Sequence, residues 1–363
     1  MKKNILVVDD SALMRRVICD IINSDNRFQA VDTCSDGLLA YEKLKSTTYD
    51  AVLLDIHMPR MDGLQLLQRL KADGISATVI MVSTLTTEGA DITIQAMELG
   101  AVDFVTKPDN VIEAKGADFR KRLTEMLNAV LTSKELSASL QKMKRPSGVR
   151  AASSTTGSVQ RERIQAPKRI NRKLVALACS TGGPKALHTV IPMLEPNMDA
   201  PVVIVQHMPV GFTKSLAERL NEMSKVSVKE AAEGDVLKKG AVYIAPGGKH
   251  LEVVCAAGGE HKIHLNDLPA IGGLKPCANI MYESLMDCQY DEITCVVLTG
   301  MGADGTAGIT QLDKCKPIHV IAQDAQTCIV YGMPRAIAEA GLVDEVVPLE
   351  SIAKTIIKNV GVK

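Results

Sequence analysis

The sequence predicts an α/β protein made of two doubly wound domains that are joined by a flexible segment. At 363 residues the chain is longer than one ordinary hydrophobic core requires, so two domains are expected. Short apolar runs alternate with helical patterns from residue 4 to about residue 131, and a second alternation begins at residue 173. A polar, basic stretch separates the two. We therefore place the domains at residues 1–131 and 173–363, with a linker at 132–172.

The first domain contains five strand-like runs that alternate with helical patterns. The runs are residues 4–8, 29–34, 51–54, 78–82 and 101–105. Between them apolar residues fall on one helical stripe, as in residues 12–22, and a last helix runs through residues 119–130. Five such units predict a five-stranded parallel sheet of the flavodoxin-like kind.

Residues 142–172 have the composition of a linker. They include a run of Ser, Thr and Gly at 153–158, two prolines and a surplus of Lys and Arg, without the apolar spacing that builds a core. A basic tail for nucleic acid or anionic lipid is the alternative interpretation. We favour a flexible basic linker.

The second domain repeats the alternation of strands and helices. Strands are expected at residues 174–179, 202–206, 241–245, 293–298, 318–322 and 343–347, and helices at 184–190, 213–223, 305–313 and 351–360. Two alternating runs, 250–255 and 261–265, flank a Gly-containing turn and are typical of an antiparallel hairpin. The prediction is a mostly parallel α/β/α sheet with an inserted β-hairpin.

Composition excludes several classes of protein. Lys+Arg and Asp+Glu are both 42, and this zero formal charge argues against a nucleic-acid-binding protein. No apolar stretch approaches membrane-spanning length, so we expect no membrane insertion. The nine Cys are scattered without CxxC spacing, which indicates packing residues in a reducing, cytoplasmic protein.

Four charged residues of the first domain follow apolar runs. They are Asp9, Asp10, Asp55 and Lys107. Because parallel strands end at one edge of the sheet, these side chains converge on one crevice. Three carboxylates repel one another unless a cation joins them, and Mg²⁺ prefers such oxygen ligands. Lys107 can then hold a phosphoryl group. The alternative is that each acid is an ordinary loop residue.

With these residues, and with Ser83, Phe104 and the turn residues after Asp55, the first domain resembles a response-regulator receiver domain. The resemblance implies that Asp55 accepts phosphate and that Asp9, Asp10 and Asp55 hold Mg²⁺. It also implies that Lys107 precedes a cis-proline position, filled by Pro108, and that Ser83 and Phe104 are the switch residues. Phe104 has no hydroxyl group, so hydrogen bonding by that ring is excluded. A phosphate adds charge and acceptors that bias a two-state surface.

A candidate nucleophile lies early in the second domain. The apolar run 174–179 leads into Ser180-Thr181-Gly182-Gly183-Pro184, which resembles the strand-to-helix elbow of serine hydrolases, with Ala178 in the first Gly place. Such a turn exposes the hydroxyl at a helix N-terminus, where N–H groups can stabilise an oxyanion. A phosphate-gripping loop is the competing interpretation, but no Gly-Lys-Ser/Thr follows. Cys179, inside the apolar run, is expected to pack.

The nucleophile needs a base and an orienting acid. His207 directly follows the run 202–206, and Asp304 lies in a Gly-rich loop after the run 293–298, so both are expected beside Ser180. His250 is the rival histidine and a candidate substrate contact. The chain order Ser, His, Asp differs from the lipase-type order.

At these residues the second domain resembles the catalytic domain of chemotaxis protein-glutamate methylesterases. The signatures are Ser180-Thr181-Gly182-Gly183, Gln206-His207-Met208-Pro209, residues 245–250 and residues 299–305. The resemblance implies that Ser180, His207 and Asp304 form the triad. It places Thr181 and Met301 at the same site, and we expect their backbone N–H groups to hold the oxyanion.

The combined resemblance implies a function. Ser180 would hydrolyse glutamate γ-methyl esters on methyl-accepting chemotaxis receptors, release methanol and also deamidate receptor glutamines, without a cofactor. Mg²⁺ and a chemotaxis histidine kinase would serve phosphorylation of Asp55, which relieves autoinhibition by the first domain. A phospho-regulated adaptor without catalysis is the alternative from another class. A phospho-regulated transcription factor lacks a recognisable helix-turn-helix and a basic balance.

Overall fold

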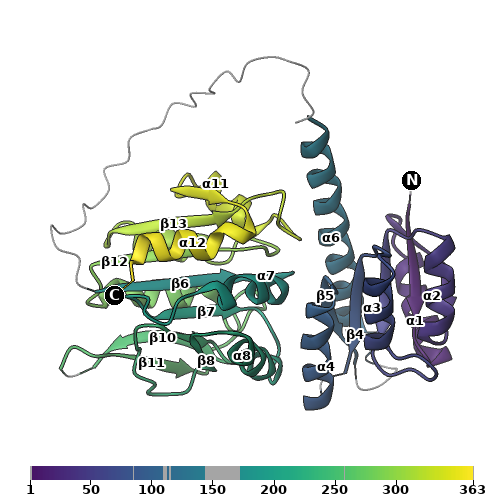
Figure 1. Ribbon diagram of the computed structural model, residues 1–363, viewed down its shortest axis with the longest axis horizontal. Helices are drawn as coiled ribbons and strands as arrows, with labels where there is room; N and C mark the ends of the chain where they lie inside the picture. Colours follow the sequence, from purple (N-terminus) through teal and green to yellow (C-terminus); the bar gives the residue numbers. More distant parts are fainter. Residues whose placement is uncertain are drawn as a thin grey trace.

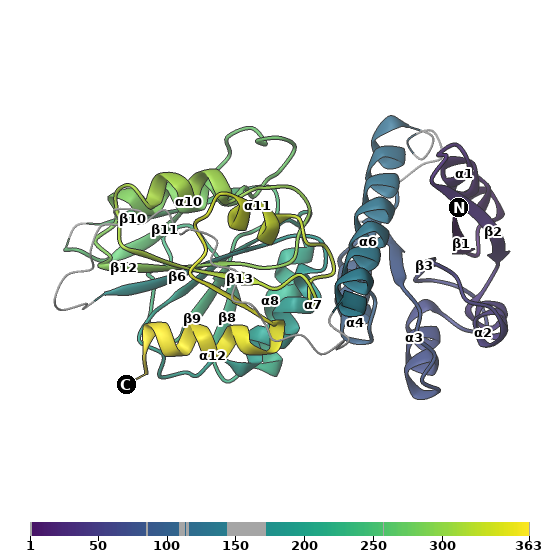
Figure 2. The same ribbon diagram turned by 90° about the horizontal axis from the view of Figure 1, so that it is seen from above.

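The computed structural model has two α/β domains side by side (Figure 1). It describes residues 2–84, 86–108, 113, 116–143, 172–256 and 258–362. One domain has a five-stranded sheet and the other a seven-stranded sheet with a separate two-stranded ribbon. Helices α4 and α6 stand between the two sheets in the views of Figures 1 and 2. The predicted architecture of two doubly wound domains is confirmed.

The N-terminal sheet is parallel throughout, with strand order β2-β1-β3-β4-β5. Its strands are β1 (Lys3–Val8), β2 (Phe28–Cys34), β3 (Ala51–Asp55), β4 (Val79–Ser83) and β5 (Asp103–Thr106). Its helices are α1 (Ala12–Asn23), α2 (Gly37–Ser46), α3 (Gly63–Ala72), α4 (Thr87–Glu98) and α6 (Ala117–Met143). Every residue of β3 and β4 is buried, as in strands that helices cover on both faces.

One predicted boundary is wrong. Helix α6 continues past residue 131 to Met143, so the start of the segment that we assigned to the linker is helical. The rest of that linker prediction, residues 144–171, lies outside the described residues.

The C-terminal sheet is also parallel in every pairing, with order β14-β13-β12-β6-β7-β9-β8. Its strands are β6 (Lys173–Cys179), β7 (Val202–Gln206), β8 (Ser227–Glu230), β9 (Ala241–Ile244), β12 (Glu292–Val297), β13 (Ile318–Gln323) and β14 (Glu345–Val347). The antiparallel ribbon consists of β10 (His250–Cys255) and β11 (His261–Asn266), which confirms the inserted hairpin.

The helices of this domain are α7 (Gly183–Val190), α8 (Phe212–Met223), α9 (Ala278–Ser284), α10 (Thr306–Leu312), α11 (Met333–Glu339) and α12 (Leu349–Val360), with 3₁₀ turns at Ile191–Met193 and Leu285–Asp287. The sequence did not predict β8, α9 or α11. β8 is a short strand at the sheet edge, and α9 and α11 are short helices without a side-chain cap, so their local signal is weak.

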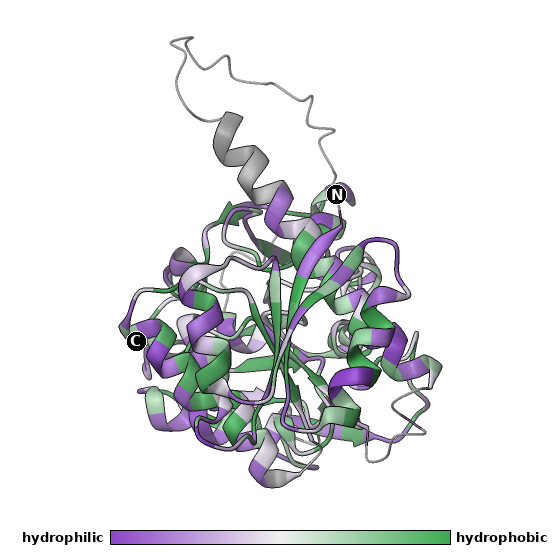
Figure 3. Ribbon diagram, turned by 90° about the vertical axis from the view of Figure 1, so that its right-hand side faces the viewer, coloured by the Kyte–Doolittle hydropathy of each residue, from purple (hydrophilic) through white to green (hydrophobic). Residues whose placement is uncertain are grey.

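Hydropathy follows the layers of the molecule. In Figure 3 the strands near the centre of the view are largely green, whereas the surrounding helices carry both purple and green residues. Central strands β6 and β7 are apolar and buried up to their last residues, Cys179 and Gln206. Polar chemistry therefore begins where these strands end.

Candidate active site and phosphoacceptor site

Adjacent strands place the candidate nucleophile beside the candidate base. The β6–β7 register pairs Cys179 with Gln206, so Ser180 and His207 are the next residues of two neighbouring parallel strands. Such strands lie about 4.8 Å apart. β12 flanks β6 on its other side and leads into the loop that carries Met301 and Asp304. The predicted convergence of three strand ends is present.

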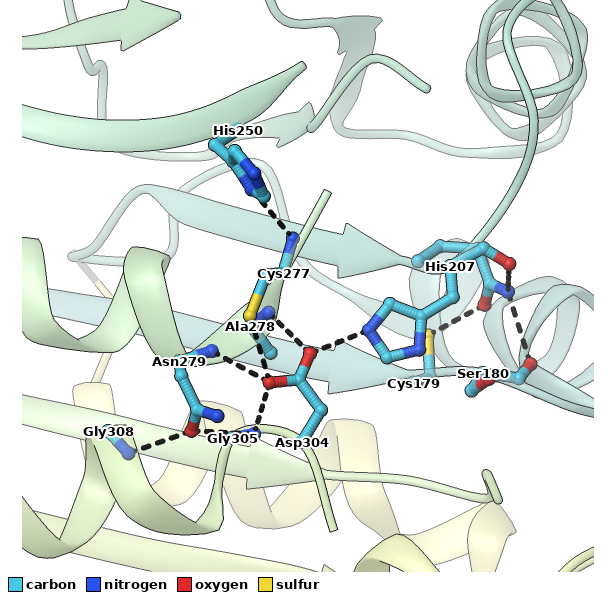
Figure 4. A network of polar contacts seen from close by, with 11 residues as sticks. Cys179, Ser180, His207, His250, Cys277, Ala278, Asn279, Asp304, Gly305 and Gly308 are labelled. Carbon is cyan, nitrogen blue, oxygen red and sulfur yellow. Dashed lines mark hydrogen bonds and ion pairs between the residues drawn. The ribbon is translucent and has the colours of Figure 1, made fainter. Parts of the chain in front are cut away.

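His207 and Asp304 form a direct contact. The distance from His207 Nε2 to Asp304 Oδ2 is 2.8 Å (Figure 4). The carboxylate also accepts the N–H groups of Ala278 at 2.6 Å, Asn279 at 3.1 Å and Gly305 at 3.0 Å, and the Cys277 thiol at 3.2 Å.

The hydrogen bonds from these donors keep the Asp304 carboxylate ionised. Burial alone raises the pKa of Asp304, but the bonds from His207 and its other donors outweigh burial and hold that pKa at about 2. Asp304 therefore stays ionised at neutral pH and can stabilise a positive charge on the imidazole.

The contact between Ser180 and His207 is not formed. In Figure 4 His207 lies between Asp304 and Ser180. Both residues are described, but no hydrogen bond joins them, and the buried Nδ1 of His207 has no partner among the described residues. Because Nε2 is bonded to Asp304, Nδ1 is the nitrogen left to accept the serine proton. Catalytic hydrogen bonds are often loose before substrate binds.

Thr181 and Met301 line the same cavity as Ser180. Within the described part of the chain, the backbone N–H groups of Thr181 and Met301 donate to no acceptor. The approach of the Met301 loop depends on Gly300, since a Cβ there would lie 2.9 Å from Ser180 Cβ and 2.3 Å from Met333 Sδ. Two unsatisfied donors beside a serine are what an oxyanion requires.

The cavity at Ser180 lies between the two domains. It has a volume of about 200 Å³. Ser180, Thr181, His207, Pro209 and Met301 line it from the C-terminal domain. From the N-terminal domain it is lined by Asp103, Phe104, Val105, Thr106, Arg122, Glu125 and Met126. The N-terminal domain thus forms one wall of the candidate active site.

Within this wall, Asp103 and Phe104 contact residues of the C-terminal domain directly. The Asp103 carboxylate, buried, accepts the Gly182 N–H at 2.9 Å and the Phe104 N–H at 2.8 Å. Burial outweighs these bonds and raises the pKa of Asp103 to about 7. The Phe104 ring stacks on Phe212 of α8, with centroids 4.5 Å apart.

Two further contacts flank the centre. Glu98 of α4 is paired with Arg219 of α8, and the bond from Arg219 lowers the pKa of Glu98. The Tyr331 N–H donates to Ser133 of α6 at 3.3 Å. No sequence pattern predicts these contacts, because each joins residues of different domains.

The N-terminal site is an assembled charge cluster. Ligand oxygens of Asp9, Asp10 and Asp55 lie within 4.8 Å of one another. Lys107 Nζ is 2.7 Å from Asp9 Oδ2 and 2.7 Å from Asp55 Oδ2. Burial raises the pKa of Asp55, and Lys107 partly offsets this. Three carboxylates in such proximity fit Mg²⁺, a hard cation that prefers oxygen ligands.

The side chains of the two predicted switch residues contact other groups than this cluster. The buried Ser83 hydroxyl accepts from Thr93 at 2.8 Å and donates toward Gly89 O at 3.3 Å, so it faces α4. Phe104 lies in the domain interface. Lys275–Pro276 is the one cis peptide bond among the described residues, so the expectation of a cis bond before Pro108 is wrong.

His250 is close to the site without lining the cavity. His250 is fully buried, and its Nδ1 accepts the Cys277 N–H at 3.2 Å (Figure 4). Its Nε2 lies 3.1 Å from Pro269 O. It supports the segment that surrounds Asp304. A direct substrate contact by His250 stays a prediction.

Comparisons with known proteins agree with this architecture. The CheB methylesterase family model matches residues 175–356, and the response regulator receiver domain model matches residues 5–115. A protein-glutamate methylesterase/protein-glutamine glutaminase of Geobacillus kaustophilus is 43% identical over 360 residues, 98% of each chain. One of Symbiobacterium thermophilum is 41% identical, over 98% of this chain and 97% of its own.

The solved structures include the Thermotoga maritima CheB methylesterase catalytic domain. It is 41% identical, with a TM-score of 0.50, and the match covers 53% of this chain and 100% of that one. The chain therefore belongs to the protein-glutamate methylesterase/protein-glutamine glutaminase family of enzymes, with an N-terminal receiver domain and a C-terminal methylesterase domain.

Proposed function

We propose that this protein demethylates glutamate γ-methyl esters on methyl-accepting chemotaxis receptors, with release of methanol, and deamidates particular receptor glutamines to glutamate. The observation that carries the proposal is the contact of 2.8 Å between His207 and Asp304, because His207 lines the same cavity as Ser180. Relatives with this activity in their names span almost the whole chain.

The proposed reaction is an acyl transfer in two steps. Ser180 Oγ attacks the side-chain carbonyl while His207 Nδ1 takes its proton, and the free N–H groups of Thr181 and Met301 hold the oxyanion. The imidazolium then gives the proton to the departing methoxide oxygen, which leaves as methanol, or, in the deamidation, to the departing amide nitrogen, which leaves as ammonia. Water, activated by the same imidazole, hydrolyses the acyl-enzyme to glutamate. Asp304 fixes the tautomer throughout, and no cofactor is required.

The proposed regulation is phosphorylation of Asp55 by a chemotaxis histidine kinase. Asp9, Asp10 and Asp55 would hold Mg²⁺, which neutralises charge on the phosphoryl oxygens. Lys107, whose Nζ is 2.7 Å from Asp55 Oδ2, would contact the phosphoryl group, and Ser83 would turn its hydroxyl toward it. Phe104, the other switch residue, is in contact with the catalytic domain. A change at Asp55 would thereby loosen the wall over Ser180.

We place the protein in the cytoplasm, where receptor helices and the kinase are accessible, and propose neither nucleic-acid binding nor membrane insertion. Among the helices of the described residues, none combines the length and the apolar character that a bilayer crossing needs.

The test is methanol release from membranes that contain methylated receptors, with and without a small phosphodonor and Mg²⁺. The full chain is expected to release methanol, and the phosphodonor to accelerate it. Ser180→Ala should release none while still binding receptor membranes, which also separates an enzyme from an adaptor. Asp55→Asn should keep the basal rate and lose the acceleration. Methanol release by Ser180→Ala at the wild-type rate would overturn the proposal.

A further inference from the structure

A buried glutamine connects the two strand ends that carry Ser180 and His207. Gln206 is the last residue of β7, and its side chain is 1% exposed. Its Nε2 donates to Ser180 O at 3.1 Å and to His207 O at 3.2 Å, and its Oε1 accepts from the Cys179 thiol at 3.0 Å. One planar amide therefore contacts three backbone or side-chain groups around the site.

The chemistry of Cys179 fixes the orientation of this amide. Cys179 is fully buried, and burial raises the pKa of its thiol far above neutrality, so it is protonated and donates. The oxygen of Gln206 must face this donor. Both amide hydrogens then point at the carbonyl oxygens of Ser180 and His207, and each polar atom of the carboxamide is satisfied.

The amide is packed directly against the turn that follows Ser180. A Cβ at Gly183 would lie 1.9 Å from Gln206 Oε1, so the side chain fills the space beneath the turn after Ser180. The Ser180 carbonyl also accepts the Gly183 N–H at 2.7 Å. The Gln206 side chain, at the end of the strand that precedes His207, therefore supports the turn that carries Ser180.

We propose that Gln206 is a positioning residue for acyl transfer, because it fastens the backbone of Ser180 to the backbone of His207. The inference rests on the proposed function of those two residues. No direct hydrogen bond joins Ser180 to His207 among the described residues. Their alignment therefore depends on the backbone, and Gln206 is the side chain that bonds to both backbones.

Two substitutions in the full chain test this role. Gln206→Met keeps the length and removes both donors. It should lower kcat for methanol release about 10- to 100-fold and change KM less than about threefold, because misplacement of reacting groups by about 1 Å costs up to about 100-fold. Gln206→Glu keeps the shape but turns a carboxylate toward two carbonyl oxygens.

The glutamate variant supplies a signature that a merely structural role would not show. Burial beside two acceptors favours the neutral acid, and a neutral acid can donate one O–H to one of the two carbonyls. The kcat of Gln206→Glu relative to wild type should therefore rise as the pH falls from about 8.5 to about 6. The same ratio for Gln206→Met should stay flat.

The control for general destabilisation is Ile356→Ala, a buried core substitution on α12 outside the cavity lining. It should lower the melting temperature of the full chain at least as much as Gln206→Met while kcat stays within about twofold. If Gln206→Met keeps wild-type kcat while Ser180→Ala is inactive, the positioning role is wrong and the proposed function stands. If Ser180→Ala is active, the proposed function fails. A flat pH ratio for Gln206→Glu also overturns the inference.

Discussion

Both domains carry their site residues at the carboxyl-terminal edge of a parallel sheet, but different interactions keep those residues in position. In the N-terminal domain, Lys107 bridges Asp9 and Asp55 at 2.7 Å each, so attraction between opposite charges assembles the site. In the C-terminal domain, among the side chains of Ser180, His207 and Asp304, His207 and Asp304 alone are hydrogen-bonded to each other, and the backbone aligns Ser180. A charge cluster tolerates movement of its members, because Coulomb energy falls slowly with distance. A nucleophile and its base do not tolerate such movement, because the proton passes between them only when they are within hydrogen-bonding distance.

The largest predicted effect comes from breaking the hydrogen bond between His207 and Asp304. Asp304→Asn presents an amide where His207 Nε2 needs an acceptor, so the tautomer that leaves Nδ1 basic is lost. We expect kcat for methanol release to fall about 10³- to 10⁴-fold. Phosphorylation of Asp55 by a small phosphodonor should be unchanged, because the two sites share no residue. A loss of less than about tenfold would contradict the assigned role of Asp304.

The second prediction concerns the pH dependence of domain closure. With the domains packed together the pKa of Asp103 is raised to about 7, whereas a solvated aspartate has a pKa of about 3.9. Protonation therefore favours the closed arrangement. The stabilisation of the closed arrangement by protonated Asp103 is complete below the pKa of a solvated aspartate. It is lost as the pH rises through about 7.

The measurement is the ratio of unstimulated to phosphodonor-stimulated methanol release. In the wild type this ratio should rise several-fold between about pH 5.5 and about pH 7.5, since opening exposes Ser180. In Asp103→Asn, which does not titrate, the rise should disappear. Equal pH profiles for the two proteins would show that Asp103 does not control closure. The ratio cancels the titration of the catalytic groups.

The smallest predicted effect measures how much the Phe104–Phe212 stack in the domain interface contributes to inhibition. Phe104→Leu keeps an apolar side chain but removes the stack on Phe212. Aromatic pairs contribute about 0.5–1.5 kcal/mol beyond burial, so unstimulated methanol release should rise about two- to tenfold. Arg69→Gln, on the far α3 helix, is the matched control and should leave the rate unchanged. A lower rate in Phe104→Leu would contradict an inhibitory stack.

Much of this arrangement could be predicted from the sequence, because most of the predicted site residues lie at or just after the end of a strand that the apolar runs reveal. Asp55 and His207 are examples, since parallel strands bring their ends to one edge. Gln206 and Asp103 could not be assigned a role in the same way. The partners that matter most, the Ser180 carbonyl and the Gly182 N–H, are backbone groups far away in the sequence, and a backbone group leaves no trace in residue type. The acceptor role of Asp304 was predicted, but its four backbone and thiol donors were not.

Helix α6 has a mechanical consequence for activation. Arg122 and Met126 line the cavity, and Ser133 holds the Tyr331 N–H. These positions are spaced i, i+4 and i+11, so they fall on one stripe of a continuous helix. A small roll of this rod about its own axis would withdraw the whole stripe at once. The part of the wall over Ser180 that α6 forms should then move as a single cooperative unit.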